Sequence, residues 1–217
     1  METVLGIDEA GRGPVIGPLV IAGIRIKESN IKKLQELGVR DSKQIAPKKR
    51  EFMYDKIIDI VDDYEILIIP PKEIDEALNS DNLNLNWLEA IKSAIIINKL
   101  KPNKAILDCP STNIAAYKNY LSIYLKDNSI NIICEHKADE NYPSVSAASI
   151  LAKVVRDKKV KELAAKYGDL GSGYPSDPKT QKFLKLNWEK YPEIFRRTWS
   201  SYKRFSKKKS QKSLKEF

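Results

Sequence analysis

Short apolar runs rich in β-branched residues alternate along the first part of the chain with segments in which apolar residues recur every three or four positions. Such alternation is typical of an α/β domain, in which strands and helices follow one another. The apolar runs predict strands at residues 3–8, 15–26, 64–69, 104–108 and 130–135. The helical spacing predicts helices at 53–61, 85–95 and 112–126.

The connections between the predicted strands indicate a mixed sheet. Strands joined through a helix pair in parallel by right-handed crossovers, whereas the short connector after Asp8 predicts an antiparallel hairpin. Beyond Asn141 the strand signal ends, and the pattern predicts a long helix at 144–166, a Gly/Pro-rich loop at 168–178 and more helix through Trp188. We therefore predict an α/β core at 1–141, a helical C-terminal part at 142–205 and a basic flexible tail at 206–217.

The composition of the 217 residues, 42% hydrophobic and 31% charged, indicates a globular protein rather than a disordered or fibrous chain. The net charge of +9 is concentrated at one end of the chain. Residues 196–217 hold nine Lys or Arg against a single acid, Glu216, so the other 195 residues carry only +1. Such a basic segment is either a solvated tail or a contact for the phosphates of a nucleic acid.

Several protein classes are excluded by what the sequence lacks. No run approaches 18 apolar residues, so we expect a soluble protein without a membrane-spanning helix. Two cysteines, Cys109 and Cys134, and no apolar run after Met1 predict neither a disulfide framework nor a secretory signal, hence a cytoplasmic location. A single histidine, His136, excludes a multi-histidine zinc site. The chemistry is therefore expected to depend on carboxylates.

Acidic residues stand at the ends of three predicted strands. They are Asp8 and Glu9, Asp108, and, shortly after the last strand, Asp139. The carboxyl ends of parallel strands gather at one edge of a sheet, so these side chains are expected to converge. A carboxylate cluster without histidine suits hard divalent ions such as Mg²⁺ or Mn²⁺, two of which can clamp a phosphoryl displacement. The alternative is that each acid is an ordinary turn or cap residue.

Gly11, Gly13 and Gly17 follow the first predicted strand with the spacing Gly-x-Gly-x-x-x-Gly. A dinucleotide-binding loop has a different spacing and opens a helix, whereas the residues after Gly17 continue a strand pattern. A dinucleotide-dependent oxidoreductase is therefore rejected. The loop is then either a tight hairpin turn or a backbone that a phosphate or hydroxyl group can approach closely.

The residues around this loop resemble the N-terminal signature of the ribonuclease HII family, the type 2 ribonucleases H. The signature reads Gly6-Ile7-Asp8-Glu9-Ala10-Gly11-Arg12-Gly13-Pro14, followed by Gly17-Pro18-Leu19-Val20. The resemblance continues in order through Asp41-Ser42-Lys43, Asp108, Asp139, the run 146–157 and the segment 171–177. It implies a ribonuclease-H-like fold, which agrees with the predicted mixed sheet flanked by helices and the helical C-terminal part.

The resemblance implies an endonuclease that hydrolyses the RNA strand of RNA–DNA hybrids and cuts at single ribonucleotides in duplex DNA, leaving 3′-hydroxyl and 5′-phosphate ends. Such an enzyme would act in DNA replication and repair. Two divalent ions, Mn²⁺ or Mg²⁺, would be held by Asp8, Glu9, Asp108 and Asp139. The related ribonuclease HIII carries a glutamate as its fourth acid, so Asp139 favours type 2.

The resemblance also assigns residues to the substrate. The backbone of Gly11, Arg12 and Gly13, together with Tyr174, would read the ribose 2′-hydroxyl, the group that distinguishes RNA from DNA. Phosphate contacts or support of the site would come from Ser42, Lys43, Lys153 and Arg156. The helical part at 142–205 would thereby complete the substrate groove. A core-packing role is the alternative for Tyr174.

The last seven residues resemble the motif Gln-x-x-aliphatic-x-x-aromatic-aromatic, which binds the replication sliding clamp (PCNA), without the final aromatic. Gln211, Leu214 and Phe217 fall on one side of a short 3₁₀ segment at this spacing. A chance match in a Lys/Ser-rich tail is the alternative. Without a heptad repeat or a large apolar surface stretch, the chain is expected to be a monomer. The alternative to a nuclease is a non-enzymatic basic protein that binds nucleic acid through its tail.

Overall fold

The computed structural model describes residues 2–39 and 45–213, with side chains described as far as Ser206. The chain forms two compact units that interleave along the sequence. The first comprises residues 1–10, 20–68 and 84–156, and the second comprises 11–19, 69–83 and 157–217. The functional division at residues 141 and 205 that the sequence suggests stays a prediction.

A five-stranded mixed sheet forms the centre of the first unit. Its strands are β1 (Thr3–Ala10), β2 (Leu19–Lys27), β3 (Asp63–Ile69), β4 (Lys104–Asp108) and β5 (Asn131–Glu135), in the order β3-β2-β1-β4-β5. β1 pairs antiparallel with β2 and parallel with β4, and β4 pairs parallel with β5. These pairings confirm the predicted mixed sheet, including the hairpin after the first strand.

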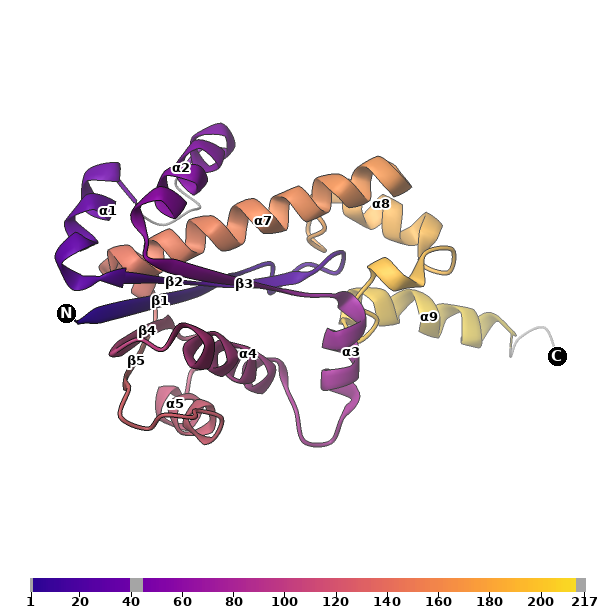
Figure 1. Cartoon of the computed structure of the whole chain (residues 1–217). Helices are drawn as coiled ribbons and strands as arrows, with labels where there is room; N and C mark the ends of the chain where they lie inside the picture. Colours follow the sequence, from indigo (N-terminus) through magenta and orange to yellow (C-terminus); the bar gives the residue numbers. More distant parts are fainter. Residues whose placement is uncertain (1, 40–44, 214–217) are drawn as a thin grey trace. The chain divides into compact units, whose positions relative to one another are not determined.

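Helices cover both faces of this sheet (Figure 1). α1 (Ile31–Leu37) and α2 (Pro47–Ile60) lie on one side, and α4 (Leu85–Leu100) and α5 (Ile114–Ile123) lie on the other. Asn84 and Asn113 cap the last two helices by accepting hydrogen bonds from backbone N–H groups at the third position of each helix. The short α6 (Ala138–Asn141) follows β5, and the long α7 (Pro143–Tyr167) comes after it.

Side chains of β2 point alternately to the two faces of the sheet and contribute to the core of the first unit on both. Ala22, Ile24 and Ile26 point to one face, where they pack with α1, α2 and residues 147–152 of α7. Gly23 points to the opposite face, where a Cβ atom would meet Ile96 of α4. Because successive side chains of a strand point to opposite faces, this single strand contributes to both layers. Among the described residues, no helix is long and apolar enough to span a membrane.

The second unit contains three helices and the glycine-containing loop. The helices are α3 (Pro71–Asn79), α8 (Pro178–Asn187) and α9 (Ser200–Ser213), and α7 extends into this unit. Val15 and Ile16 of the loop are buried in a core that includes Phe183 of α8, Phe195 and Tyr202. The loop is therefore anchored by its own apolar residues.

The structure differs from the sequence prediction in three places. The strand expected over 15–26 begins only at Leu19, because Pro14 and Pro18 lack N–H groups and the amides of Val15 and Ile16 donate to the carbonyl of Gly173 instead. α1, α3 and α6 have no predicted counterpart. α9 continues to Ser213, where a flexible tail is expected from residue 206; Lys, which is frequent there, is a good helix former.

Candidate functional site

The strand register brings two predicted acids to the same level of the sheet. Ile7 of β1 pairs with Leu107 of β4, so Asp8 and Asp108, the next residue of each strand, lie side by side at the carboxyl edge. Glu9 follows Asp8, and its side chain belongs to the opposite face of the sheet because consecutive residues of a strand alternate. The parallel pairing therefore brings Asp8 and Asp108 together, as the sequence predicts, and Glu9 adds its charge from the next position of β1.

Asp8 is only 5% exposed and lies in a negative environment. Burial is the main cause that raises the pKa of its carboxyl group well above the ordinary value, and the charges of Glu9 and Asp108 raise it further. Two hydrogen bonds oppose this rise in pKa, one from the hydroxyl of Ser149 on α7 and one from the backbone N–H of Glu9, at 2.7 Å. These two hydrogen bonds thus hold the carboxylate in one orientation, although its ionisation remains unfavourable.

Asp139 is connected to Asp108 through the first turn of α6. The Oδ1 atom of Asp108 accepts a hydrogen bond of 3.0 Å from the backbone N–H of Ala138, the residue before Asp139. The backbone carbonyl of Asp139 in turn accepts a bond of 2.6 Å from the Ser146 hydroxyl. Asp139 is buried. These bonds fix the backbone of the fourth acid relative to the third.

The donor set of this acid cluster, defined as Asp8, Glu9, Asp108 and Asp139, fits a divalent cation. All its side-chain donors are hard carboxylate oxygens, and a cation beside Asp8 would offset the like charges that raise its pKa. Among the side chains that the structure describes, no three acidic, histidine or cysteine groups are gathered closely enough to hold a metal ion. Mg²⁺ sites ordinarily use one or two protein carboxylates together with waters and substrate phosphates, so an open cluster suits this ion.

The second unit contains the glycine loop and Tyr174. Gly11 and Gly17 have φ angles of 89° and 85°, which other residues rarely adopt. A Cβ atom on Gly13 would lie 3.4 Å from the Tyr174 ring, so this ring packs directly on the loop backbone. Tyr174 is 38% exposed. The exposure argues against the core-packing role that was the alternative for this residue.

The remaining predicted substrate residues have different surroundings. Lys153 is half-buried and Arg156 is buried, both on α7 in the first unit. Ser42 and Lys43 lie outside the described residues, as do Leu214 and Phe217 of the predicted clamp motif. Gln211 lies in the last turn of α9, within a segment whose side chains are not described.

Two residues of evident importance have no predicted role in the sequence. Ser149 lies within the family-like run 146–157, but only the packing of α7 on β1 shows that its hydroxyl reaches Asp8. Arg196 counts toward the basic segment 196–217, yet its side chain is fully buried. From its place in the basic segment, Arg196 is expected to be solvated or to contact phosphates, and the burial of its side chain contradicts this expectation. His136 has a local role, since its Nδ1 atom lies 2.9 Å from the Cys109 carbonyl oxygen.

Comparisons of the sequence and of the fold with known proteins lead to the same family. Residues 5–202 match the family model for ribonuclease HII. Ribonuclease HII of Pyrococcus horikoshii is 46% identical over 221 aligned positions, covering 99% of this chain and 98% of that protein. The fold matches the crystal structure of ribonuclease H2 from the same organism, with a TM-score of 0.87, 45% identity and coverage of 95% of this chain and 98% of the other.

A second solved structure is also similar, that of the PCNA:RNase HII complex from Archaeoglobus fulgidus. It gives a TM-score of 0.78 at 39% identity, covering 88% of this chain and 89% of the other. These similarities confirm the ribonuclease-H-like mixed sheet flanked by helices.

Proposed function

Because this chain belongs to the ribonuclease HII family of metal-dependent endoribonucleases, which degrade the RNA strand of RNA–DNA hybrids, we propose that its acid cluster carries out the hydrolysis. The observation that supports this assignment is the buried Asp8 carboxylate beside Glu9 and Asp108 at the carboxyl edge of the parallel strands. The same assignment makes Asp139 the fourth acid. The finer proposal is that the enzyme also cuts at single ribonucleotides in duplex DNA and leaves 3′-hydroxyl and 5′-phosphate ends.

The acid cluster is proposed to hold two divalent ions, Mg²⁺ or Mn²⁺. When bound, such ions supply positive charge that stabilises the attacking and leaving oxygens of a phosphoryl displacement. The protein's own contribution is to fix the ligands. The Ser149 hydroxyl and the Glu9 N–H orient Asp8, and the Ala138 N–H orients Asp108. Such hydrogen bonds to ligating carboxylates typically tune both their orientation and their affinity.

The glycine loop and Tyr174 are proposed to read the ribose 2′-hydroxyl. The support is local to the second unit, where the exposed Gly13 backbone and the partly exposed Tyr174 ring pack against each other. Backbone N–H and C=O groups can bond to a hydroxyl, and an aromatic ring can stack on a sugar or a base. The helical C-terminal part thereby takes part in substrate binding.

Other residues are proposed to serve the phosphate backbone. The half-buried Lys153 suits a direct contact, whereas the burial of Arg156 favours support of the site. Ser42 and Lys43 stay predicted phosphate contacts on the family resemblance alone. A cytoplasmic, monomeric enzyme likewise stays a prediction made from the sequence.

A sliding clamp is proposed as a protein partner through Gln211, Leu214 and Phe217. The similarity to the Archaeoglobus fulgidus protein that was solved in a PCNA complex supports this proposal. The three residues repeat at intervals of three at the end of the chain, following a strongly basic segment.

The decisive experiment is cleavage of a labelled DNA duplex that contains one ribonucleotide, with Mn²⁺, with Mg²⁺ and with chelator. The wild type is expected to cut at the ribonucleotide only when a divalent ion is present, and Asp108→Asn is expected to lose this activity while still binding the duplex. Asp127→Asn serves as the matched control, because Asp127 is exposed and contacts Ser129 instead. Full activity of Asp108→Asn would refute the assignment.

A further inference from the structure

Arg196 lies between the 3₁₀ helix at Pro192–Ile194 and α9, and its side chain is 0% exposed. Its guanidinium donates hydrogen bonds to three backbone carbonyls of the glycine loop. Nη2 donates to Gly11 at 2.6 Å, Nη1 to Arg12 at 2.9 Å and Nε to Gly17 at 3.0 Å. Although Arg196 is part of the basic segment 196–217, its side chain therefore binds the glycine loop.

Trp199, the residue directly before α9, contacts both Arg196 and the glycine loop. Its ring lies 4.9 Å from the guanidinium carbon of Arg196, and its Nε1–H donates to the carbonyl of Gly13 at 3.2 Å. Together, Arg196 and Trp199 therefore bind the carbonyls of Gly11, Arg12, Gly13 and Gly17. Hydrogen bonds from a buried charged donor are stronger than neutral ones, so this is a firm attachment.

Holding these carbonyls also sets the direction of specific N–H groups. A trans peptide unit is planar, and its C=O and N–H point in opposite directions. The structure has no cis peptide among its described residues. The Gly11 carbonyl therefore fixes the N–H of Arg12, and the Arg12 carbonyl fixes the N–H of Gly13, both pointing away from the guanidinium. The units after Gly13 and Gly17 end in prolines and carry no N–H.

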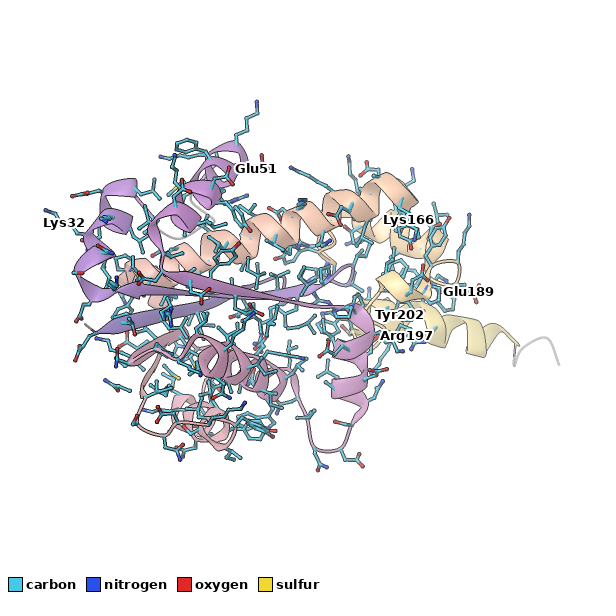
Figure 2. All side chains as sticks on the ribbon, in the orientation of Figure 1. Lys32, Glu51, Lys166, Glu189, Arg197 and Tyr202 are labelled. Atoms are coloured by element: carbon cyan, nitrogen blue, oxygen red, sulfur yellow. The ribbon has the colours of Figure 1, made fainter. Side chains whose placement is uncertain are left out.

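The segment around Arg196 is itself immobilised. The Arg196 N–H donates to Val15 at 2.9 Å. The buried carboxylate of Asp75, on α3, accepts from the N–H of Arg197 at 2.8 Å and from the N–H and hydroxyl of Thr198 at 2.9 and 2.6 Å. Figure 2 labels Arg197, whose side chain also approaches Asp75 at 3.8 Å. The guanidinium is therefore presented from a fixed backbone.

We propose that Arg196 is a positioning residue for ribose recognition, which aims the amides of Arg12 and Gly13 at the sugar 2′-hydroxyl. This proposal rests on the proposed role of the loop in reading the ribose. A loop with two glycines at positive φ has many accessible conformations, and the planar guanidinium selects one of them by bonding three carbonyls at once. The single ammonium nitrogen of a lysine lacks this fork of donors.

The test compares the binding of two duplexes of the same sequence, one with a single ribonucleotide and one all-deoxy, in the presence of chelator. Fluorescence anisotropy gives Kd for each, and urea unfolding gives the folded fraction of each variant. Arg196→Lys is expected to raise Kd for the ribonucleotide duplex about tenfold, as for the loss of one or two hydrogen bonds, without changing Kd for the all-deoxy duplex. Trp199→Phe, which removes only the bond to Gly13, is expected to raise it about threefold.

The matched control is Arg204→Lys, since Arg204 is exposed on α9 and the change is chemically the same. It is expected to leave both Kd values unaltered. A purely structural role of Arg196 would weaken the binding of both duplexes in proportion to the unfolded fraction, and that result would overturn the proposal. If Arg196→Lys does not fold, the test rests on Trp199→Phe. If this variant keeps the wild-type ratio of the two Kd values, the proposal is overturned. A wild type without any preference would instead refute ribose reading by the loop itself.

Discussion

A Cβ atom placed on Gly6 would lie 2.2 Å from the carbonyl carbon of Ser144, so β1 and the first turn of α7 meet at backbone distance. Gly6 precedes Asp8 by two residues on the same face of the strand. Ser149, whose hydroxyl bonds to Asp8, follows Ser144 on the same helix. The absence of a side chain at Gly6 therefore allows the helix to approach the acid cluster.

Gly6→Ala should destabilise the protein by about 1–3 kcal/mol and lower its nuclease activity, because a backbone segment must move to make room for the methyl group. Urea unfolding and the rate of cleavage measure the two effects. Gly23→Ala is the comparison, since its added Cβ would meet side-chain atoms of Ile96 and Leu5 rather than backbone atoms. A Gly6→Ala protein that is at least as stable as Gly23→Ala would contradict this explanation.

Asp8→Asn should stabilise the metal-free protein at neutral pH while removing activity. Since folding raises the pKa of Asp8, folding favours its protonated form. The stabilising contribution of this carboxyl is therefore complete at low pH, below its unfolded pKa, and is lost as pH rises through the raised folded pKa. At neutral pH the charged group destabilises the fold. Each kcal/mol that Asp8→Asn adds to the free energy of unfolding should raise Tm by about 2–4 °C.

Thermal unfolding in chelator across a pH series tests this prediction. The difference in Tm between Asp8→Asn and the wild type should grow as pH rises. Asp127→Asn is the control of opposite sign, because hydrogen bonds from the Ser129 side chain and backbone lower the pKa of this exposed carboxyl. Its Tm at neutral pH should be unchanged or slightly reduced. A pH-independent gain in Asp8→Asn would indicate that packing, not charge, is responsible.

Tyr174→Ala should slow cleavage at a single ribonucleotide by about 5- to 150-fold, as expected for the loss of one aromatic stacking contact, about 1–3 kcal/mol. Its effect on stability should be small, since the side chain is 38% exposed. Tyr64→Ala is a control of matched exposure, at 37%, on strand β3. Cleavage rates and urea midpoints of the two variants give the comparison. An unchanged rate in Tyr174→Ala would defeat its assignment to the ribose.

Deletion of residues 211–217 should abolish binding to a sliding clamp and leave the basal nuclease rate unchanged, because the three anchor residues are removed while the acid cluster is retained. Surface plasmon resonance with immobilised clamp measures the binding. Ser213→Ala changes a position between the anchors and should bind like the wild type. If the truncated protein still binds, the clamp contact must lie elsewhere on the chain.

Much of the candidate site could be predicted because it follows from local order along the chain. Asp8 and Asp108 end strands that the apolar runs predict, and the helix between successive strands requires parallel pairing, which brings strand ends together. The glycine spacing likewise predicts a turn after β1. The loop at 11–18 was harder to predict, because its apolar residues look like strand residues but are buried among residues distant in sequence, such as Phe183 and Tyr202.

By itself, the sequence determined the family, the alternation of strands and helices, and the acids that end the strands, because periodicity, chain polarity and motif spacing are all local properties. The tertiary structure alone decided that Ser149 reaches Asp8 and that Arg196 leaves the basic segment to bind the glycine loop. Gly17 and Arg196 are 179 residues apart. A contact at that separation depends on how whole elements pack, and only packing determines whether an arginine near the end of the chain faces solvent or three buried carbonyls.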